Sequence, residues 1–267
     1  VILAAKNGDI FLHKAFGYHT YSKKKPVMRG NIYDLASITK VVATTSALMK
    51  LVDEKKLSLD DKVITYLPEY IGKQKMFFDQ KSKVTIRHLI THTSGLPPFK
   101  KYFLMDGNIQ TKIDSIMNTE PEIPLNQKMI YSDIGLIVLG KIIESVSQSS
   151  LDEYVDSVVF KPLGMKTTFY NPPIEKIKRI IPTEYSSLYG ETIIGYVHDE
   201  NAKSIGGIAG HAGLFSTASD LSIFSQMMLN GGIYGWKRIF QSETIKDFTK
   251  SCLLYTSPSP RDQRGSR

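Results

Sequence analysis

The sequence is poor in cysteine and tryptophan, with one of each among 267 residues. A single cysteine, Cys252, excludes a disulfide framework and a zinc site built from cysteines. No apolar run approaches the ~18 residues that a membrane-spanning helix requires. A lone cysteine can still be a nucleophile, so the residues around Cys252 decide how it is interpreted.

Charged residues are scattered along the chain. The formal net charge is +8, but the densest group of lysines, Lys23 to Lys25, spans only three residues. We interpret this group as an exposed loop, with a nucleic-acid contact as the alternative. With 42% hydrophobic and 22% charged residues, the composition is typical of a globular protein rather than a disordered or fibrous one.

The two ends of the chain are unusual. Residues 252–267 show no apolar periodicity and can be read as translated sequencing adapter, with a natural tail as the alternative. Without them the only cysteine is lost, and the formal charge falls from +8 to +6 because three arginines and one aspartate are removed. Val1 opens directly into a strand pattern, with no visible signal peptide. We therefore expect residues 1–251 to be part of a longer domain.

Apolar periodicity predicts an N-terminal hairpin followed by a series of helices. Residues 1–5 and 10–18 are apolar runs on either side of Asn7-Gly8, which is the strongest short-range hairpin signal. Thr85 and Asp133 stand where the N-caps of two helices are expected. The spacing of apolar side chains predicts helices over residues 37–56, 85–91, 134–146, 151–160, 219–229 and 242–250.

Ser37 and Lys40 form the first group that suggests chemistry. A serine hydroxyl is a weak nucleophile unless a base lies beside it. Positions i and i+3 of a helix share one face, so Lys40 would lie beside Ser37 and, once neutral, could accept its proton. The free N–H groups of the helix N-terminus would stabilise an oxyanion. Ser22 and Lys25 have the same spacing in a predicted loop, and the alternative is a helix cap followed by a surface lysine.

Tyr131 and Asp133 form a second group, just before the apolar helix at 134–146. A phenol can act as a general base where neighbouring cations stabilise the phenolate, and Lys40 is a candidate cation. The alternative is a tyrosine packed on a loop, with Asp133 only capping the helix. Tyr154 and Asp156 show that the same spacing also arises by chance.

The histidines and glycines give no independent signal. His88 and His92 have i, i+4 spacing but no third metal ligand nearby, so we predict no metal site. We assign no role to His198 and Asp199. The glycines at positions 206, 207, 210 and 213 lack phosphate-loop spacing, so nucleotide binding is not predicted.

The two groups, in this order, resemble the serine β-lactamase and penicillin-binding-protein superfamily, in which Ser-x-x-Lys is a signature. The chain is most similar to the class C-like branch, which holds class C β-lactamases, D-alanyl-D-alanine carboxypeptidases and esterases. The resemblance runs from residue 1 to residue 250 and includes residues 16–18, 33–40, 89–97, 161–165 and 210–217. Residues 195–217 are also similar to hydrolase domains fused behind a family 3 glycoside hydrolase, which implies an upstream partner domain.

The resemblance implies roles for individual residues. Ser37 would be the acylated nucleophile, Lys40 its activating partner and Tyr131 a base and proton shuttle. The backbone N–H of Ser37 would form half of the oxyanion hole. Asp133 would contact substrate, although the family usually has asparagine at this position. An ionised carboxylate only accepts hydrogen bonds, which disfavours a β-lactam or an acidic substrate but leaves acyl transfer itself intact.

One family motif is not found. It consists of Lys or His, then Thr or Ser, then Gly, and it would supply the other half of the oxyanion hole. The segment at His211 lies too early and lacks the hydroxyl residue, so we interpret it as a glycine-rich loop. We expect the third motif beyond residue 250.

The resemblance implies a mixed α+β fold, with an antiparallel sheet flanked by helices, an all-helical region, and the C-terminal strands missing. We expect the N-terminal hairpin to open this sheet, and the chain to fold poorly alone. The predicted function is that of a periplasmic or secreted serine hydrolase without a cofactor. It would act on an ester, an amide or a β-lactam, as a small molecule or a peptidoglycan-derived substrate, and not on nucleic acid. The alternative is a non-catalytic cell-wall binding or scaffold domain.

Overall fold

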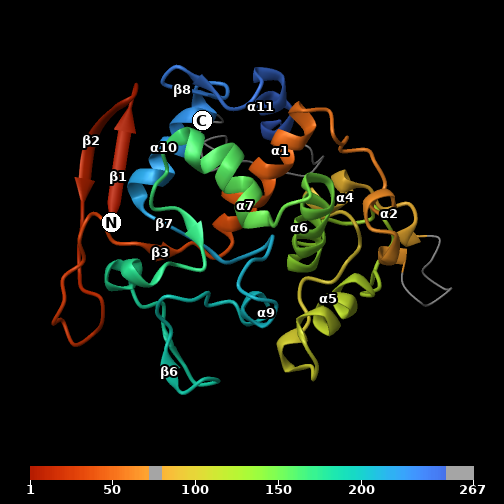
Figure 1. The fold of residues 1–267 in the computed structure, drawn as a ribbon, viewed down its shortest axis with the longest axis horizontal. Coiled ribbons are helices and arrows are strands. Elements are labelled where there is room, and N and C mark those ends of the chain that lie inside the picture. The colour runs from red at the N-terminus through yellow and green to blue at the C-terminus, as the bar shows by residue number, and fades with distance from the viewer. Residues whose placement is uncertain (72–79, 251–267) are drawn as a thin grey trace, which may run out of the picture.

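The computed structural model describes residues 1–71 and 80–250. Short strands lie toward one side of the molecule and helices fill the other (Figure 1). The strands are β1 (Ile2–Lys6), β2 (Asp9–Lys14), β3 (Tyr33–Asp34), β4 (Phe169–Tyr170), β5 (Tyr185–Ser186), β6 (Glu191–Thr192), β7 (Leu214–Ser216), β8 (Ile233–Tyr234) and β9 (Lys237–Arg238).

The helical segments include several single turns. They are η1 (Lys40–Thr45), α1 (Ser46–Asp53), α2 (Val63–Tyr66), η2 (Pro68–Ile71), α4 (Ile86–Ile90), η3 (Tyr102–Leu104), α5 (Ile109–Met117), α6 (Asp133–Ser147), α7 (Leu151–Val155), η4 (Asp156–Phe160), α8 (Lys161–Leu163), η5 (Ile174–Arg179), α9 (Glu200–Ser204), α10 (Ala218–Leu229) and α11 (Ser242–Thr249). Of these, η1 and η4 are π-helical and continue directly into α1 and α8.

The predicted N-terminal hairpin is confirmed. β1 and β2 pair antiparallel, and Asn7 and Gly8 turn the chain with φ angles of 54° and 89°. The second strand ends at Lys14, four residues before the predicted end, because the chain turns at Gly17, where φ is 78°. β1 lies beside α10 (Figure 1).

Within the described residues the strands form four small antiparallel sheets, and the hairpin is one of them. That the hairpin opens a larger sheet stays a prediction, because its further strands were expected mostly beyond the described residues. A second sheet consists of β3, β7 and β4. In that three-stranded sheet the fully buried β7 is central, and Tyr33 pairs with Ser216. The pairing fixes β3 immediately before the segment that carries Ser37.

The longest helix of the described residues, α6, forms the centre of the core. Its side chains are buried on nearly every face, and it packs against α4, η1 and α1. Burial of each large aliphatic side chain contributes about 1.5–3 kcal/mol. The N-cap is Ser132, whose Oγ accepts from the Gly135 N–H at 3.3 Å, so the prediction of Asp133 as N-cap is wrong by one residue. Asp133 is the first residue of the helix, and its side chain pairs with Lys40 instead of capping the helix.

The other predicted helices are present with shifted ends. Thr85 caps α4 as predicted, with its hydroxyl accepting from the His88 N–H. The helix after Ser150 continues through Pro162 to Leu163 and ends at Gly164, where φ is 73°. Pro162 lies in the last turn of this continuous helix, two residues before the left-handed Gly164.

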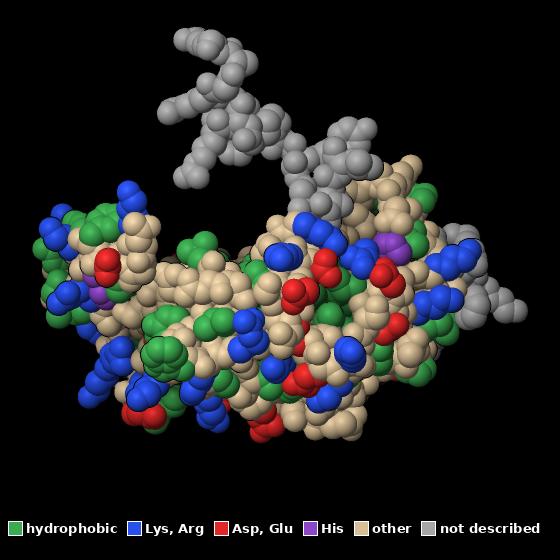
Figure 2. All heavy atoms as spheres, turned by 90° about the horizontal axis from the view of Figure 1, so that it is seen from above, with side chains coloured by type: hydrophobic (Ala, Val, Ile, Leu, Met, Phe, Trp, Pro, Cys, Tyr) green, Lys and Arg blue, Asp and Glu red, His purple; other side chains and the backbone are tan. Residues whose placement is uncertain are grey.

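Within the described residues, no single helix has the length and apolar character to cross a membrane. α6 and the following segment Leu151–Leu163 meet those criteria only together, as a pair bent by 72°. Lysine and arginine are interspersed with acidic side chains on the face shown in Figure 2.

Candidate active site

Ser37 stands at the entrance to the η1–α1 helix, directly after β3. The turn between them is held by Asp34, whose Oδ1 accepts from the Ala36 N–H at 2.8 Å and whose Oδ2 accepts from the His198 N–H at 2.8 Å. Ala36 has a φ of 45°, a left-handed conformation that costs an L-residue energy. This strained turn leaves the Ser37 side chain exposed at the start of a buried helix.

Lys40 lies beneath Ser37 and is 5% exposed. Its Nζ donates to the Oγ of Ser37 at 2.7 Å and to the carbonyl oxygen of His211 at 3.2 Å. The i, i+3 relationship expected from the sequence is therefore present as a direct contact. The His211 carbonyl comes from a segment more than 170 residues away, and the sequence analysis gave it no role.

The third partner of Lys40 is Asp133, with Nζ 2.8 Å from Oδ1. That oxygen is buried and lacks the alignment of a hydrogen bond, so the contact is an ion pair rather than a directed bond. Lys40 Nζ thus makes two hydrogen bonds, to Ser37 and His211, and one ion pair, to Asp133. The predicted neutral lysine would require Lys40 first to pass one proton on.

Tyr131 lies over the same ammonium. The Lys40 Nζ is 4.8 Å from the centroid of the Tyr131 ring, within the range of a cation–π contact. Tyr131 is 51% exposed, so it is accessible from solvent while it contacts Lys40. The structure therefore brings together all four residues predicted from the two motifs, and their individual chemical roles stay predictions.

His92 is a neighbour of this group for which the sequence analysis predicted no role in the site. Its ring centroid is 4.6 Å from that of Tyr131, at an angle of 40°, and its Nδ1 accepts from the Ser132 N–H at 3.1 Å. Burial lowers the pKa of His92, the charge of Lys40 lowers it further, and Asp133 opposes them. A neutral His92 ring holds Tyr131 in place without adding positive charge. In the sequence His92 lies within the segment 89–97 that resembles the family, and that likeness gave it no role beside Tyr131.

The loop between α9 and β7 packs against the site and supplies the His211 carbonyl that accepts from Lys40. Gly210 packs against α6, where a Cβ would lie 2.0 Å from the Leu136 carbonyl oxygen, so only glycine permits this approach. The buried His211 places Nε2 2.8 Å from Asp199 Oδ1. Burial acts to raise the pKa of Asp199, but the hydrogen bond and charge of His211 outweigh it, so that pKa is lowered. This side-chain pair anchors the loop whose carbonyl holds Lys40.

The other candidates from the sequence do not assemble a site. Lys25 Nζ donates to the Lys178 carbonyl oxygen at 2.7 Å, while the Ser22 hydroxyl bonds that of Thr20, so the residues of the second Ser-x-x-Lys spacing are engaged with different partners. His88 bonds Thr85 and Asn126. Over residues 1–71 and 80–250, no three His, Cys, Asp or Glu side chains are placed to hold a metal ion.

Two predictions fall outside the described residues. They are the adapter-derived tail at 252–267 and a third family motif beyond residue 250.

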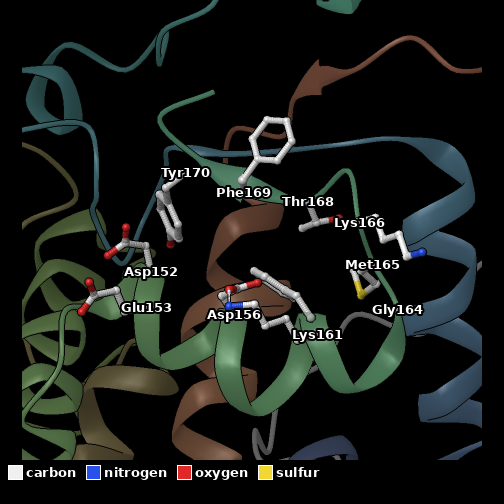
Figure 3. Close-up of a pocket in the computed structure, with 11 residues that line it drawn as sticks. Asp152, Glu153, Asp156, Lys161, Gly164, Met165, Lys166, Thr168, Phe169 and Tyr170 are labelled. Atoms are coloured by element: carbon white, nitrogen blue, oxygen red, sulfur yellow. Dashed lines mark ion pairs between the residues drawn. The ribbon is translucent and has the colours of Figure 1, made fainter. Parts of the chain in front are cut away.

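A cavity of about 520 Å³ is found elsewhere in the fold, and neither Ser37 nor Lys40 lines it (Figure 3). The candidate site is thus recognised by the contacts of its side chains rather than by a large cavity.

Residues 1–246 match the sequence profile of the Beta-lactamase family. The chain belongs to this family. A curated relative from Salmonella agona, named "Putative D-alanyl-D-alanine carboxypeptidase", is 35% identical over 93% of this chain and 64% of its own length. The chain therefore spans a little under two thirds of that relative.

Solved structures place this member of the Beta-lactamase family in the same fold group. The octameric penicillin-binding protein homologue from Pyrococcus abyssi is similar over 92% of this chain and 55% of its own, with 27% identity and a TM-score of 0.73. The class C β-lactamase from Rhodobacter sphaeroides is similar over 86% of this chain and 59% of its own, with 20% identity and a TM-score of 0.65. The second likeness shows the fold alone, and it agrees with the class C-like resemblance of the motifs.

Proposed function

We propose that this protein is a serine hydrolase that forms an acyl-enzyme through Ser37. The observation that carries the proposal is the 2.7 Å contact between Lys40 Nζ and Ser37 Oγ at the start of a buried helix. A nucleophile and an adjacent group able to exchange its proton are what covalent catalysis by serine requires. Membership of the Beta-lactamase family supports the same reaction class.

In the proposed reaction the Ser37 hydroxyl loses its proton as its oxygen bonds the substrate carbonyl carbon. Tyr131, as a phenolate beside the Lys40 ammonium, or Lys40 itself once neutral, accepts that proton. The negative charge that develops on the carbonyl oxygen faces the N–H of Ser37, which lies in the first turn where N–H groups lack helical partners. The tetrahedral intermediate then collapses, the leaving group takes the proton, and water later cleaves the acyl-enzyme.

We propose an ester, an amide or a β-lactam as the substrate, with a peptide ending in D-alanine as the first to test. The name of the Salmonella relative supports a carboxypeptidase-type substrate. Asp133 would contact that substrate beside Lys40. A peptidoglycan-derived peptide would be met in the periplasm or outside the cell, which is where we propose that the protein acts.

A labelling experiment tests the proposal. Full-length protein is incubated with a fluorescent penicillin and, separately, with a fluorescent phosphonate, and labelling is followed on a denaturing gel. We expect covalent labelling that Ser37→Ala abolishes. Ser22→Ala is the matched control, because Ser22 has the same spacing to a lysine but lies in an exposed loop. It should label like the wild type.

Two outcomes would contradict the proposal. Labelling that survives Ser37→Ala would show that another residue is the nucleophile. Wild-type protein that takes neither label while binding peptidoglycan would favour the non-catalytic binding domain.

A further inference from the structure

The carboxylate of Asp34 lies three residues before Ser37 and is not a reacting group in the proposed acylation. It is half-buried at the end of β3, where Asp34 pairs with Phe215 of β7. Its Oδ1 accepts from the Ala36 N–H and its Oδ2 from the His198 N–H, each at 2.8 Å. Both oxygens thus hold backbone, and the second bond reaches across 164 residues of the chain.

The turn that Asp34 holds is strained. Ala36 has a φ of 45°, and a left-handed residue other than glycine persists only where its surroundings fix it. On the preceding side the Leu35 N–H donates to the Leu214 carbonyl oxygen at 2.9 Å, which ties the chain to β7. The N–H of Ala36 itself is taken by Asp34. This bond therefore fixes the residue directly before the nucleophile.

The turn leaves one backbone donor free beside the nucleophile. The Ile38 N–H donates to the Leu35 carbonyl oxygen at 3.0 Å, and the Thr39 N–H donates to that of Ala36 at 3.1 Å. Among the hydrogen bonds of the described residues, none has the Ser37 N–H as its donor. A free N–H beside an attacking hydroxyl is placed to stabilise the oxyanion, provided its direction is fixed.

The segment tied to Asp34 also fixes Lys40. Asp199 directly follows His198, and its Oδ1 lies 2.8 Å from the Nε2 of the buried His211. The His211 carbonyl oxygen in turn accepts from Lys40 Nζ at 3.2 Å. The Asp34 carboxylate therefore connects the turn of the nucleophile to the segment that holds the activating lysine.

We propose that Asp34 is a positioning residue for the acylation of Ser37. By accepting from two backbone N–H groups, it holds the strained turn whose free N–H faces the substrate carbonyl oxygen. This inference rests on the proposed function. A carboxylate suits the task because its two oxygens accept from two donors at once. An asparagine amide has one acceptor oxygen and would turn its own N–H groups toward the second donor.

The test separates the rate of acylation from the binding of the probe. The full-length protein is titrated with whichever fluorescent probe, phosphonate or penicillin, labels the wild type at Ser37. The limiting rate constant and the half-saturating concentration are then obtained separately. We expect Asp34→Ala to lower the limiting rate constant about 100-fold, as for a misplaced reacting group. The half-saturating concentration should change less than about twofold, because the loss falls on the transition state.

Two further variants make the result specific. Asp34→Asn keeps the size and one acceptor oxygen, so it should lower the limiting rate constant only about tenfold, and it carries the test if Asp34→Ala does not fold. Asp61→Asn is the matched control, because Asp61 is also half-buried and accepts a backbone N–H, that of Ser58 at 2.7 Å, at a turn outside the site. Its rate constant should stay within about twofold of the wild type. Circular dichroism and thermal melts show which variants are folded.

Failure of this inference is distinct from failure of the proposed function. If neither probe labels the wild type at Ser37, the proposed function fails and the role of Asp34 fails with it. If the wild type is labelled but folded Asp34 variants react at its rate, the positioning role alone is overturned. A higher half-saturating concentration with an unchanged limiting rate constant would also overturn it, because that result would assign Asp34 to binding of the probe.

Discussion

The side chains of Lys40 and Asp133 form an ion pair, with Nζ 2.8 Å from Oδ1, while the same Nζ donates to Ser37. Lys40 is nearly buried, and the Asp133 side chain is 22% exposed. The pair links the start of η1 to the start of α6, two helices that meet only in the folded chain. It places a carboxylate beside the proposed nucleophile, where the family usually has an amide.

Replacing Asp133 by asparagine should speed acylation. An asparagine amide can donate to a substrate carbonyl oxygen, whereas the carboxylate only accepts. We expect Asp133→Asn to raise the acylation rate constant with fluorescent penicillin about tenfold, a change typical of one added hydrogen bond to a substrate. Stopped-flow or gel-based time courses measure it. Asp133→Ala, which removes the carboxylate without supplying a donor, is the comparison, and equal rates for the two variants would refute the explanation.

Breaking the ion pair from one side should destabilise the fold. Lys40→Met leaves the Asp133 carboxylate without its cation, and loss of one partner of a buried pair costs about 3 kcal/mol in the free energy of unfolding. Adding Asp133→Asn should recover about half of that loss, because the stranded charge is removed. Denaturant titrations of the full-length wild type, both single variants and the double variant give the coupling. Strictly additive effects would show that the two side chains do not interact.

Replacing Gly210 by alanine should destabilise the fold and slow labelling of Ser37. A Cβ there would lie 2.0 Å from the Leu136 carbonyl oxygen of α6, and neither backbone can move alone. We expect Gly210→Ala to lower the free energy of unfolding by about 3 kcal/mol. Labelling of Ser37 should also slow, because the His211 carbonyl that holds Lys40 would shift. Gly30→Ala is the control, since its Cβ would meet only the flexible end of Arg179, and stability close to wild type is expected.

A buried lysine outside the site should make stability depend on alkaline pH. Lys81 is fully buried, donates to the Met117 carbonyl oxygen at 2.6 Å and lies 4.3 Å from the Tyr70 ring centroid. Burial lowers the pKa of Lys81 to about 8, against the opposing charge of Glu120. Between about pH 8 and 10.5 the unfolded chain therefore binds more protons at this residue than the folded one, so stability rises with pH across that window.

The comparison of wild type with Lys81→Met isolates this effect from other titrating groups. Relative to the variant, the wild type should gain about 3 kcal/mol in the free energy of unfolding as pH rises from 8 to 10.5. Below pH 8 the difference should be constant. Denaturant titrations at several pH values measure it, and a difference that does not change with pH would contradict burial of a titrating amine.

Local sequence determined much of the secondary structure. Asn7 and Gly8 suit the positive φ angles of a tight hairpin, so the turn could be predicted without its surroundings. Thr85 caps α4 through a hydroxyl three residues from its N–H partner. The i, i+3 spacing of Ser37 and Lys40 also predicted their contact, because one helical turn brings such side chains together. Each of these relationships closes within a few residues of the chain.

Adjacent residues with similar chemistry were harder to separate. Ser132 and Asp133 are both good N-caps, and only the folded chain shows that Ser132 caps α6 while Asp133 pairs with Lys40. The β3–β7–β4 sheet joins three segments that are far apart in the sequence. Pairing between distant strands depends on which segments meet in the folded chain, and the local pattern of side chains does not determine that pairing.

The tertiary structure alone decided the environment of the proposed nucleophile. Lys40 meets the His211 carbonyl, the Asp133 carboxylate and the Tyr131 ring, which come from segments far apart in the sequence. These contacts follow from the packing of α6 and the glycine-rich loop against η1, where Gly210 permits an approach that any side chain would prevent. The sequence alone thus determined which residue types were available and at what local spacing. Close packing of distant segments decided which of them share a site, because those contacts depend on the whole core.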